Sequence, residues 1–375
     1  MRLMMDRRLI AHFDGLLLLT VLTIVGLGTM TVYSATWDAS RSMPTGFAWR
    51  QTSWSLIGLV GLLGATVFDY RRLERYAFVL YVAGLALLAA VPLVGEIGGG
   101  SRRWISIGPV TVQPSEMMKL ALIIFLARLF HHRIRPGGLR LRDLALPTLA
   151  AMPPVFLILE QPDLGTAGVF VFVFASMVLL AGPSWGTLGL LVLACMGAVP
   201  VLLSGLKEYQ LRRLTTFFNP EMDPLGAGYH LIQSKIAIGS GGLAGRGFLQ
   251  GTQNQLNFLP EQHTDFIFSV YSEEWGFFGA ITLIALYALV VLRGLMAVNR
   301  AKERFGALIA FGVLSNVFWQ AAINVGMTTG LLPVVGITLP FFSYGGSSMV
   351  SLMLGIGLLI NVNMRRHSRE RLPRY

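Results

Sequence analysis

Two carboxylates and a histidine lie at alternate positions just before a long apolar run: Glu261, His263 and Asp265. Acidic side chains at the start of a membrane-spanning segment are energetically costly and usually have a function. Asp265 could act as a general base if its surroundings raised its pKa towards neutrality. Alternatively, Asp265 could simply complement the positive end of a helix dipole, which would lower its pKa. The crowding of Glu261 and His263, after a long loop, favours the catalytic interpretation.

A second pair of charged residues, Glu116 and Lys119, lies inside another apolar segment. Their i, i+3 spacing places both side chains on one face of a helix. One interpretation is an internal salt bridge that fixes helix packing, because either charge alone would be costly in hydrocarbon. The other interpretation is that Lys119 faces an outward cavity and binds an anion.

Two polar segments add candidate ligand-binding groups. Segment 98–108 is rich in glycine and includes Arg103 and Trp104. The arginine fork matches phosphate oxygens, whereas Trp104 could instead anchor the segment at the membrane interface. Gln113 and Asp163 each stand next to a proline where an apolar segment begins, a pattern that ordinary helix capping also explains.

The composition is that of a polytopic membrane protein. Hydrophobic residues make up 54% of the 375 residues, charged residues make up 13%, and the mean hydropathy is +0.63. These values exclude an ordinary soluble domain. The single cysteine, Cys195, excludes an intramolecular disulfide. The apolar run after the basic N-terminus is longer than a signal-peptide core, so we expect it to be retained as the first span.

We predict an all-α integral membrane protein with about ten transmembrane helices, which forms a single domain over 1–375. The expected spans are 15–35, 52–68, 76–94, 115–130, 144–159, 164–181, 187–206, 266–292, 306–327 and 347–362. Most of the 30 lysines and arginines fall between spans on the side of the N-terminus, which predicts that both termini are cytoplasmic. The net charge of +11 is therefore mainly a topology signal and does not indicate nucleic-acid binding.

This topology places one long extracytoplasmic loop, 207–264, before the eighth span. Its basic residues, among them Arg213 and Lys235, lie on the disfavoured side of the membrane and indicate an anionic ligand, with Gln233 nearby. Residues 229–238 have the pattern of an interfacial amphipathic helix. The segment 330–348 is interrupted by proline and glycine, so we expect a re-entrant loop beside a cavity or a simple outer loop.

Several kinds of site are not indicated by the sequence. His131 and His132 are expected to lie on the cytoplasmic side without partner ligands for a metal. The sequence contains no nucleophile elbow, zinc-protease motif or Walker sequence, and the glycine cluster 239–242 is too loose for a nucleotide loop.

The chain resembles the SEDS family (shape, elongation, division, sporulation), and its RodA branch most closely. The matching segments follow the order of the family and are 103–105, 113–119, 161–166, 233–242, 259–266 and 339–347. Segments 223–230 and 251–253 favour the RodA branch over the division branch. The chain departs from the pattern at Gln262, where a cation is expected, and at Trp275, where the branch often has leucine.

The resemblance implies a peptidoglycan glycosyltransferase that acts during cell elongation in the bacterial inner membrane. Its substrate would be lipid II, a disaccharide-pentapeptide on undecaprenyl diphosphate. Its partners would be a class B penicillin-binding protein and the elongation proteins MreB, MreC and MreD. The family's catalytic carboxylate maps onto Asp265. The expected substrate-binding residues are Arg103, Trp104, Gln113, Lys119, Asp163, Arg213, Gln233, Lys235, Glu261, His263, Ser343 and Tyr344.

The reaction expected from these residues is an inverting transfer in which Asp265 removes a proton from the attacking sugar hydroxyl. The leaving diphosphate needs positive charge, which arginine and lysine side chains or a divalent cation such as Mg²⁺ or Mn²⁺ could supply. No resident cofactor is indicated. The alternatives are a lipid II flippase, which broken helices and intramembrane charges also suit, and a scaffold for the penicillin-binding protein.

Overall fold

The structure is a computed structural model that describes residues 12–38, 43–44, 46–98, 101–108, 110–134, 137–204, 208–222, 226–256, 258 and 261–367. A long helix occupies each of the predicted spans. These helices are α2 (Gly15–Ala35), α3 (Phe47–Val67), α4 (Arg71–Val94), α5 (Pro114–His131), α6 (Leu141–Glu160), α7 (Leu164–Ala181), α8 (Trp185–Ser204), α12 (Ile267–Arg300), α13 (Arg304–Thr329) and α14 (Gly346–Met364).

Of these helices, seven are long and apolar enough to cross a membrane, as judged over the described residues: α2, α4, α6, α7, α12, α13 and α14. The chain is therefore a mostly helical integral membrane protein, as the composition predicts. The remaining three helices are α3, α5 and α8. Helix α5 contains the charged residues Glu116, Lys119 and Arg128. Such charges lower the apolar character on which a span is recognised, so the count of ten spans stays a prediction.

The chain is not purely helical. Two short sheets lie in the connections, formed by β1 (Trp37–Asp38) with β2 (Met43–Pro44) and by β3 (Glu96–Gly98), β4 (Ser101–Ile107) and β5 (Val110–Val112). The three-stranded sheet is antiparallel, with Trp104 opposite Glu96 and Ile105 opposite Val112. The sequence did not predict these strands, because the hydrogen bonds join short segments across turns that span prediction treats as loops.

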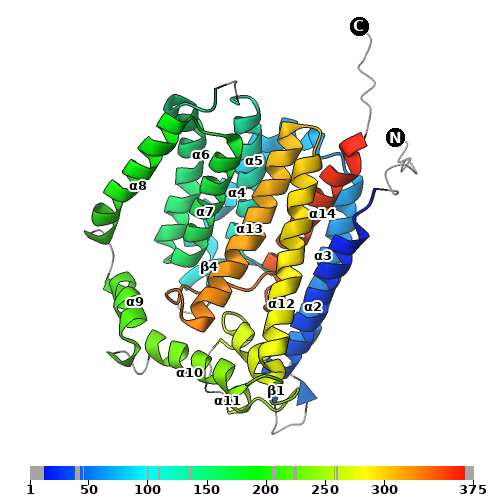
Figure 1. Cartoon of the computed structure of the whole chain (residues 1–375), viewed down its shortest axis with the longest axis vertical. Helices are drawn as coiled ribbons and strands as arrows, with labels where there is room; N and C mark the ends of the chain where they lie inside the picture. The colour runs from blue at the N-terminus through cyan, green and yellow to red at the C-terminus, as the bar shows by residue number, and fades with distance from the viewer. Residues whose placement is uncertain are drawn as a thin grey trace.

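The long loop before α12 forms α9 (Glu208–Phe218), the short η1 (Pro220–Met222), α10 (Ala227–Ser240) and α11 (Thr252–Gln255). Figure 1 shows α9, α10 and α11 along one end of the bundle, the end where β1 also lies. The helix predicted over 229–238 is thus present as part of α10. Ser234 fastens α10 to the bundle, because its hydroxyl lies 2.6 Å from the Ser269 hydroxyl of α12 and donates to the carbonyl of Thr328 at 2.7 Å.

The core lies around α13 and α14, which are buried along most of their length. Helix α14 packs closely on α3, and Gly357 makes this approach possible. A Cβ atom at Gly357 would lie 2.5 Å from the carbonyl oxygen of Leu62, so no larger residue fits there. Gly28 of α2 has the same role towards the backbone of Phe342, which a Cβ would approach to 2.5 Å.

Helix α12 is interrupted at Gly276, whose φ of 65° and ψ of −160° are not helical. A glycine-rich turn from the preceding loop pairs with the freed backbone groups. The amides of Phe277 and Phe278 donate to the carbonyls of Gly242 and Leu243 at 2.9 and 3.2 Å. Irregular backbone inside a membrane protein needs such internal partners.

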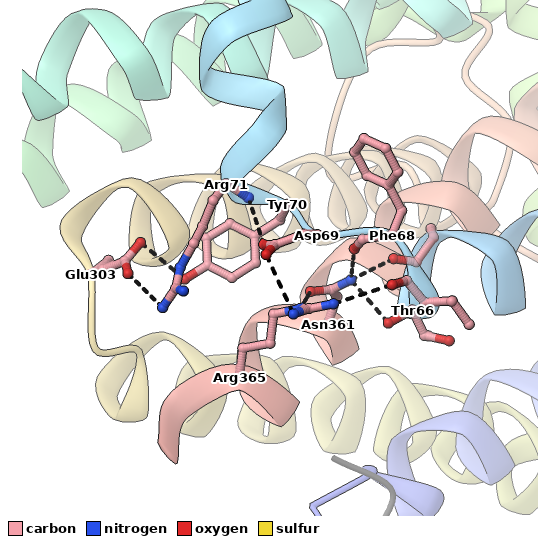
Figure 2. A network of polar contacts seen from close by, with 10 residues as sticks. Thr66, Phe68, Asp69, Tyr70, Arg71, Glu303, Asn361 and Arg365 are labelled. Atoms are coloured by element: carbon pink, nitrogen blue, oxygen red, sulfur yellow. Dashed lines mark hydrogen bonds and ion pairs between the residues drawn. The ribbon is translucent and has the colours of Figure 1, made fainter. Parts of the chain in front are cut away.

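The opposite end of the bundle is held by a network of polar contacts (Figure 2). The amide of Asn361 on α14 donates to the carbonyls of Ala65, Thr66 and Phe68, at the corner between α3 and α4. Arg365 lies 3.4 Å from Asp69 and donates to the carboxamide oxygen of Asn361 at 2.9 Å. These contacts satisfy the carbonyls that the end of α3 leaves without helical partners.

Candidate active site

Asp265 lies in the turn that leads into α12, and its backbone is fixed from two sides. Its amide donates to the carbonyl of Glu261 at 3.1 Å. Its carbonyl accepts a hydrogen bond at 2.9 Å from the side-chain amide of Asn324 on α13. The same side-chain amide donates to the carbonyl of Ile337 at 2.6 Å. A Cβ at Gly336 would be 3.1 Å from Oδ2 of Asp265. The carboxylate therefore faces the segment between α13 and α14.

The surroundings of Asp265 shift its proton affinity in the direction that a general base requires. Burial raises the pKa of Asp265 to about 7, and the negative charges of Glu261 and Asp163 add to the rise. Arg103 and Arg213 act in the opposite direction. At neutral pH the carboxyl group can therefore both accept and release a proton. The alternative role as a plain helix-dipole partner predicted a lowered pKa, which the structure does not show.

Arg103 and Asp163 form the part of the site nearest to α7. Arg103 lies 3.5 Å from Asp163 and donates to the carbonyls of Gln161 and Pro162 at 3.2 and 2.6 Å. Asp163 also caps α7, since its Oδ1 accepts the amide of Thr166 at 3.0 Å. The predicted capping role of Asp163 is confirmed. The guanidinium is thereby held near Asp265 and remains partly exposed.

The residues predicted on the long loop do not all gather at Asp265. Arg213, on α9, is half-buried and close enough to lower the pKa of Asp265. Gln233 is half-buried on α10, and Lys235 is exposed there and lies over Gly330, where a Cβ would be 2.6 Å from Nζ. Lys235 thus lies at the end of α13 and directly follows Ser234, the residue that fastens α10 to the bundle.

A group of rings adjoins the other side of the turn. His263 lies between Phe47 and Tyr344, with ring centroids 4.8 and 5.8 Å apart. The amide of Tyr344 donates to the carbonyl of His263 at 3.0 Å. Burial lowers the pKa of His263, partly opposed by the charge of Glu261, and so favours the neutral imidazole. A neutral imidazole can position a substrate by hydrogen bonding and supplies no positive charge.

Ser343 has its hydroxyl engaged within the protein. It donates to the carbonyl of Thr264 at 2.6 Å and accepts the amide of Leu339 at 2.7 Å. Gln51 of α3 binds the same segment, because its amide donates to the carbonyl of Ser343 at 3.1 Å. These bonds tie the turn before Asp265 to the segment before α14. They favour a positioning role for Ser343 over direct contact with substrate.

Glu116 and Lys119 form the internal salt bridge that their spacing allows. Nζ of Lys119 lies 2.7 Å from Oε1 of Glu116, and the two side chains are 4% and 6% exposed. Oε2 of Glu116 has no hydrogen-bond partner among the described residues.

At the start of helix α5, the backbone amide of Gln113 donates to the hydroxyl of Ser347 at 3.0 Å. Helix α5 is thus fastened to α14 beside the site. Trp104 lies half-buried in β4.

Three residues of the site region have structural roles that the sequence did not predict: Asn324, Glu273 and Glu274. Glu273 accepts the amide of Gln253 at 3.1 Å, and Glu274 accepts the amide of Leu249 at 3.3 Å, so both hold the loop before α12. The signal for Asn324 was a side-chain amide within an apolar span, which in a membrane predicts a buried hydrogen bond.

Among the residues that the structure describes, one group of three side chains is spaced to hold a metal ion, formed by Glu74, His131 and His132. It lies at the opposite end of the bundle, so it is not the source of charge for a leaving group at Asp265. The predicted Mg²⁺ or Mn²⁺ alternative is not tested by this finding, because such an ion could arrive with a diphosphate substrate.

Comparison with known proteins identifies relatives over nearly the whole chain. The family model described as "Cell cycle protein" (FtsW, RodA, SpoVE) matches residues 14–368. Peptidoglycan glycosyltransferase MrdB of Escherichia coli (strain K12) is 40% identical over 356 residues, covering 95% of this chain and 94% of the relative. Peptidoglycan glycosyltransferase RodA of Treponema pallidum (strain Nichols) is 35% identical, covering 95% and 99%.

Solved structures also resemble this chain over nearly its whole length. A chain from a structure described as "Structural coordination of polymerization and crosslinking by a peptidoglycan synthase complex" superposes with a TM-score of 0.80 at 34% identity, covering 95% of this chain and 99% of that chain. The rod shape determining protein RodA of Thermus thermophilus superposes with a TM-score of 0.70 at 32% identity, covering 95% and 98%.

Proposed function

Since the chain belongs to the FtsW, RodA and SpoVE family of cell cycle proteins and is a peptidoglycan glycosyltransferase, we propose that it polymerises lipid II with Asp265 as the general base. The observation that supports this role is the carboxyl group of Asp265, raised in pKa to about 7 and flanked by Arg103 and Arg213. A base that titrates near the working pH is the most effective kind.

In the proposed reaction the 4-hydroxyl of the acceptor sugar attacks C1 of the donor sugar. A new C1–O bond forms, the bond from C1 to the lipid diphosphate breaks, and the configuration at C1 inverts. Asp265 takes the hydroxyl proton and later releases it to solvent, while the electron pair of the broken bond leaves with the diphosphate. Such acid–base assistance contributes about 100- to 10,000-fold in rate.

Charge for the leaving diphosphate is proposed to come from Arg103 and Arg213. Arg103 is held by two backbone carbonyls and Asp163, so its direction is set before substrate binds. A positive charge that is already in position stabilises the developing negative charge of the diphosphate without a cost of reorganisation during the reaction. A divalent cation bound to the diphosphate is the alternative source, and Lys235 is placed to contact a more distant part of the substrate.

The proposed topology has ten spans, with both termini in the cytoplasm of a bacterial inner membrane. Two observations support it: a helix occupies each predicted span, and the basic clusters around Arg71, Arg304 and Arg365 lie at the end away from Asp265. Substrate sugars and diphosphate would then meet α9, α10 and the three-stranded sheet at the outer surface. We further propose a class B penicillin-binding protein as partner, with MreB, MreC and MreD in the wider assembly.

The test is lipid II polymerisation by the purified protein together with its transpeptidase partner. Wild type is compared with Asp265→Asn and with Asp143→Asn, a capping carboxylate at the opposite end of the bundle. We expect glycan chains from wild type and the control, and at least about 100-fold less from Asp265→Asn. Wild-type rates in folded Asp265→Asn would refute the base assignment, and loss with a chelator would assign the charge to a metal.

A further inference from the structure

Glu74, in the first turn of α4, lies against His131 and His132 where α5 ends. Its Oε1 is 3.0 Å from Nε2 of His132 and 4.0 Å from Nε2 of His131. One ligand atom from each residue lies within 4.8 Å of the others. The expectation that the two histidines lack a partner ligand is therefore wrong, because the partner comes from a neighbouring helix that is distant in sequence.

We propose that this Glu74 cluster is a binding site for a divalent transition-metal ion, with Zn²⁺ as the ion that fits best. Two imidazoles and one carboxylate match the ligands of zinc, whereas Mg²⁺ and Ca²⁺ prefer sites made of oxygen. Three protein ligands leave a fourth position for water or another small ligand. The proposal is independent of the glycosyltransferase site, which lies at the other end of the bundle.

The separations suit such an ion. Bonds of about 2.0–2.2 Å in a tetrahedral arrangement place neighbouring ligand atoms about 3.4 Å apart. The 3.0 Å between Glu74 and His132 is already near this value, and a small rotation of His131 would shorten its 4.0 Å separation. Nδ1 of His131 is buried without a hydrogen-bond partner among the described residues. A metal-bound histidine carries its proton on the other ring nitrogen and donates it to an acceptor. The rotation that brings Nε2 of His131 to the ion must therefore also bring its Nδ1–H to a carbonyl or water.

An ion could reach the cluster from solvent. The side chains of Glu74, His131 and His132 are 31%, 33% and 59% exposed. The arginines nearby are engaged elsewhere. Arg71 lies 2.7 Å from Glu303 (Figure 2), and Arg133 donates to the carbonyl of Leu129 at 2.9 Å. Their charges still reduce the affinity for a cation, so we expect a site that fills at micromolar free zinc.

The competing explanation is an ordinary ion pair between Glu74 and a protonated histidine. A metal must displace protons from the imidazoles, so its binding weakens as the pH falls. An ion pair instead strengthens when histidine is protonated. The two explanations therefore differ in their pH dependence and in the presence of a stoichiometric ion. A bound ion would also join the start of α4 to the end of α5.

The experiment uses the full chain, purified in detergent without a polyhistidine tag and equilibrated with buffered Zn²⁺. Bound zinc is counted by mass spectrometry in wild type, Glu74→Gln, the His131→Gln/His132→Gln double variant, and the control His367→Gln. We expect wild type and His367→Gln each to bind one more zinc ion per chain than Glu74→Gln and the double variant. With Co²⁺ as probe, wild type and His367→Gln should show the visible absorption of a low-coordinate site, and the other two variants should not.

Equal zinc in wild type and the double variant would overturn the proposal and leave the ion pair. Thermal unfolding supplies the second measurement, because an ion that binds the folded state raises its Tm. Zinc should raise the Tm of wild type and not that of Glu74→Gln, and a rise in both would also overturn the proposal. If the double variant does not fold, Glu74→Gln decides, because it changes one half-exposed, near-isosteric side chain.

Discussion

Asn324 and Asp265 are joined by a hydrogen bond from the side-chain amide to the backbone carbonyl, at 2.9 Å. The same amide donates to Ile337, and Asn324 is fully buried. A single residue of α13 thus sets the position of the turn before α12 relative to the segment that faces the Asp265 carboxylate. Asn324 is a positioning residue, since it acts on Asp265 through the backbone.

Replacing Asn324 with leucine should impair catalysis through this bond. The change leaves two buried carbonyls without their donor, which costs about 1–3 kcal/mol for each. We expect kcat to fall at least about tenfold, because Asp265 loses its fixed position, while KM changes little. Polymerisation kinetics and thermal unfolding measure the two effects. Asn316→Leu, on the same helix but bonded to Gln320, is the control. Equal losses of kcat in both variants would show general destabilisation instead.

The rate of polymerisation should depend on pH through Asp265. A base must be deprotonated, and its pKa is about 7, so the rate should fall about tenfold for each pH unit below 7. The negative charge of Glu261 contributes to the raised pKa. Glu261→Gln should therefore move the acid limb of the profile to lower pH. Glu221→Gln, an exposed carboxylate of the preceding loop, should leave it in place. An unmoved limb in Glu261→Gln would contradict this account of the pKa.

The raised pKa also predicts a gain in stability when Asp265 is neutralised. The pKa of Asp265 in the folded protein lies above the ordinary aspartate value of 3.8, so the folded protein is disfavoured at pH values where this carboxyl is charged. That penalty grows as the pH rises between about 4 and 7 and disappears below this window. Asp265→Asn should therefore have a higher Tm than wild type at pH 8 and about the same Tm at pH 4.5. A lower Tm at pH 8 would show that the charge is stabilised by its arginines.

Hydropathy and charge were sufficient to predict where the long helices lie, because each span must be apolar and each connection basic or polar according to its side. They also led to Asp265, since an acid at the start of a span is rare. They could not predict how the connections fold. The three-stranded sheet around Trp104 and the break at Gly276 depend on backbone hydrogen bonds between segments. The pairing of Glu74 with His132 joins two helices in a way that no local spacing reveals.

The same limit applied to the choice between two roles for Lys119. Its i, i+3 spacing from Glu116 allowed a salt bridge, but only the packing shows both side chains buried with their charged groups 2.7 Å apart. A buried charge without its partner is destabilising by about 3–5 kcal/mol. Removing one member of this pair should therefore lower stability as well as activity.

Exchanging the two charges tests whether the pair acts as a unit. In Glu116→Lys and Lys119→Glu each single change places like charges together, so both variants should lose most of their folded protein. The double exchange restores an opposite pair and should recover part of the yield, the Tm and the polymerisation rate, with the coupling measured by a double-mutant cycle. Ser351 donates to the backbone carbonyl of Glu116, and that bond is available in every variant. Recovery of stability without activity would show that Lys119 also contacts the substrate, and recovery of neither would contradict a coupled pair.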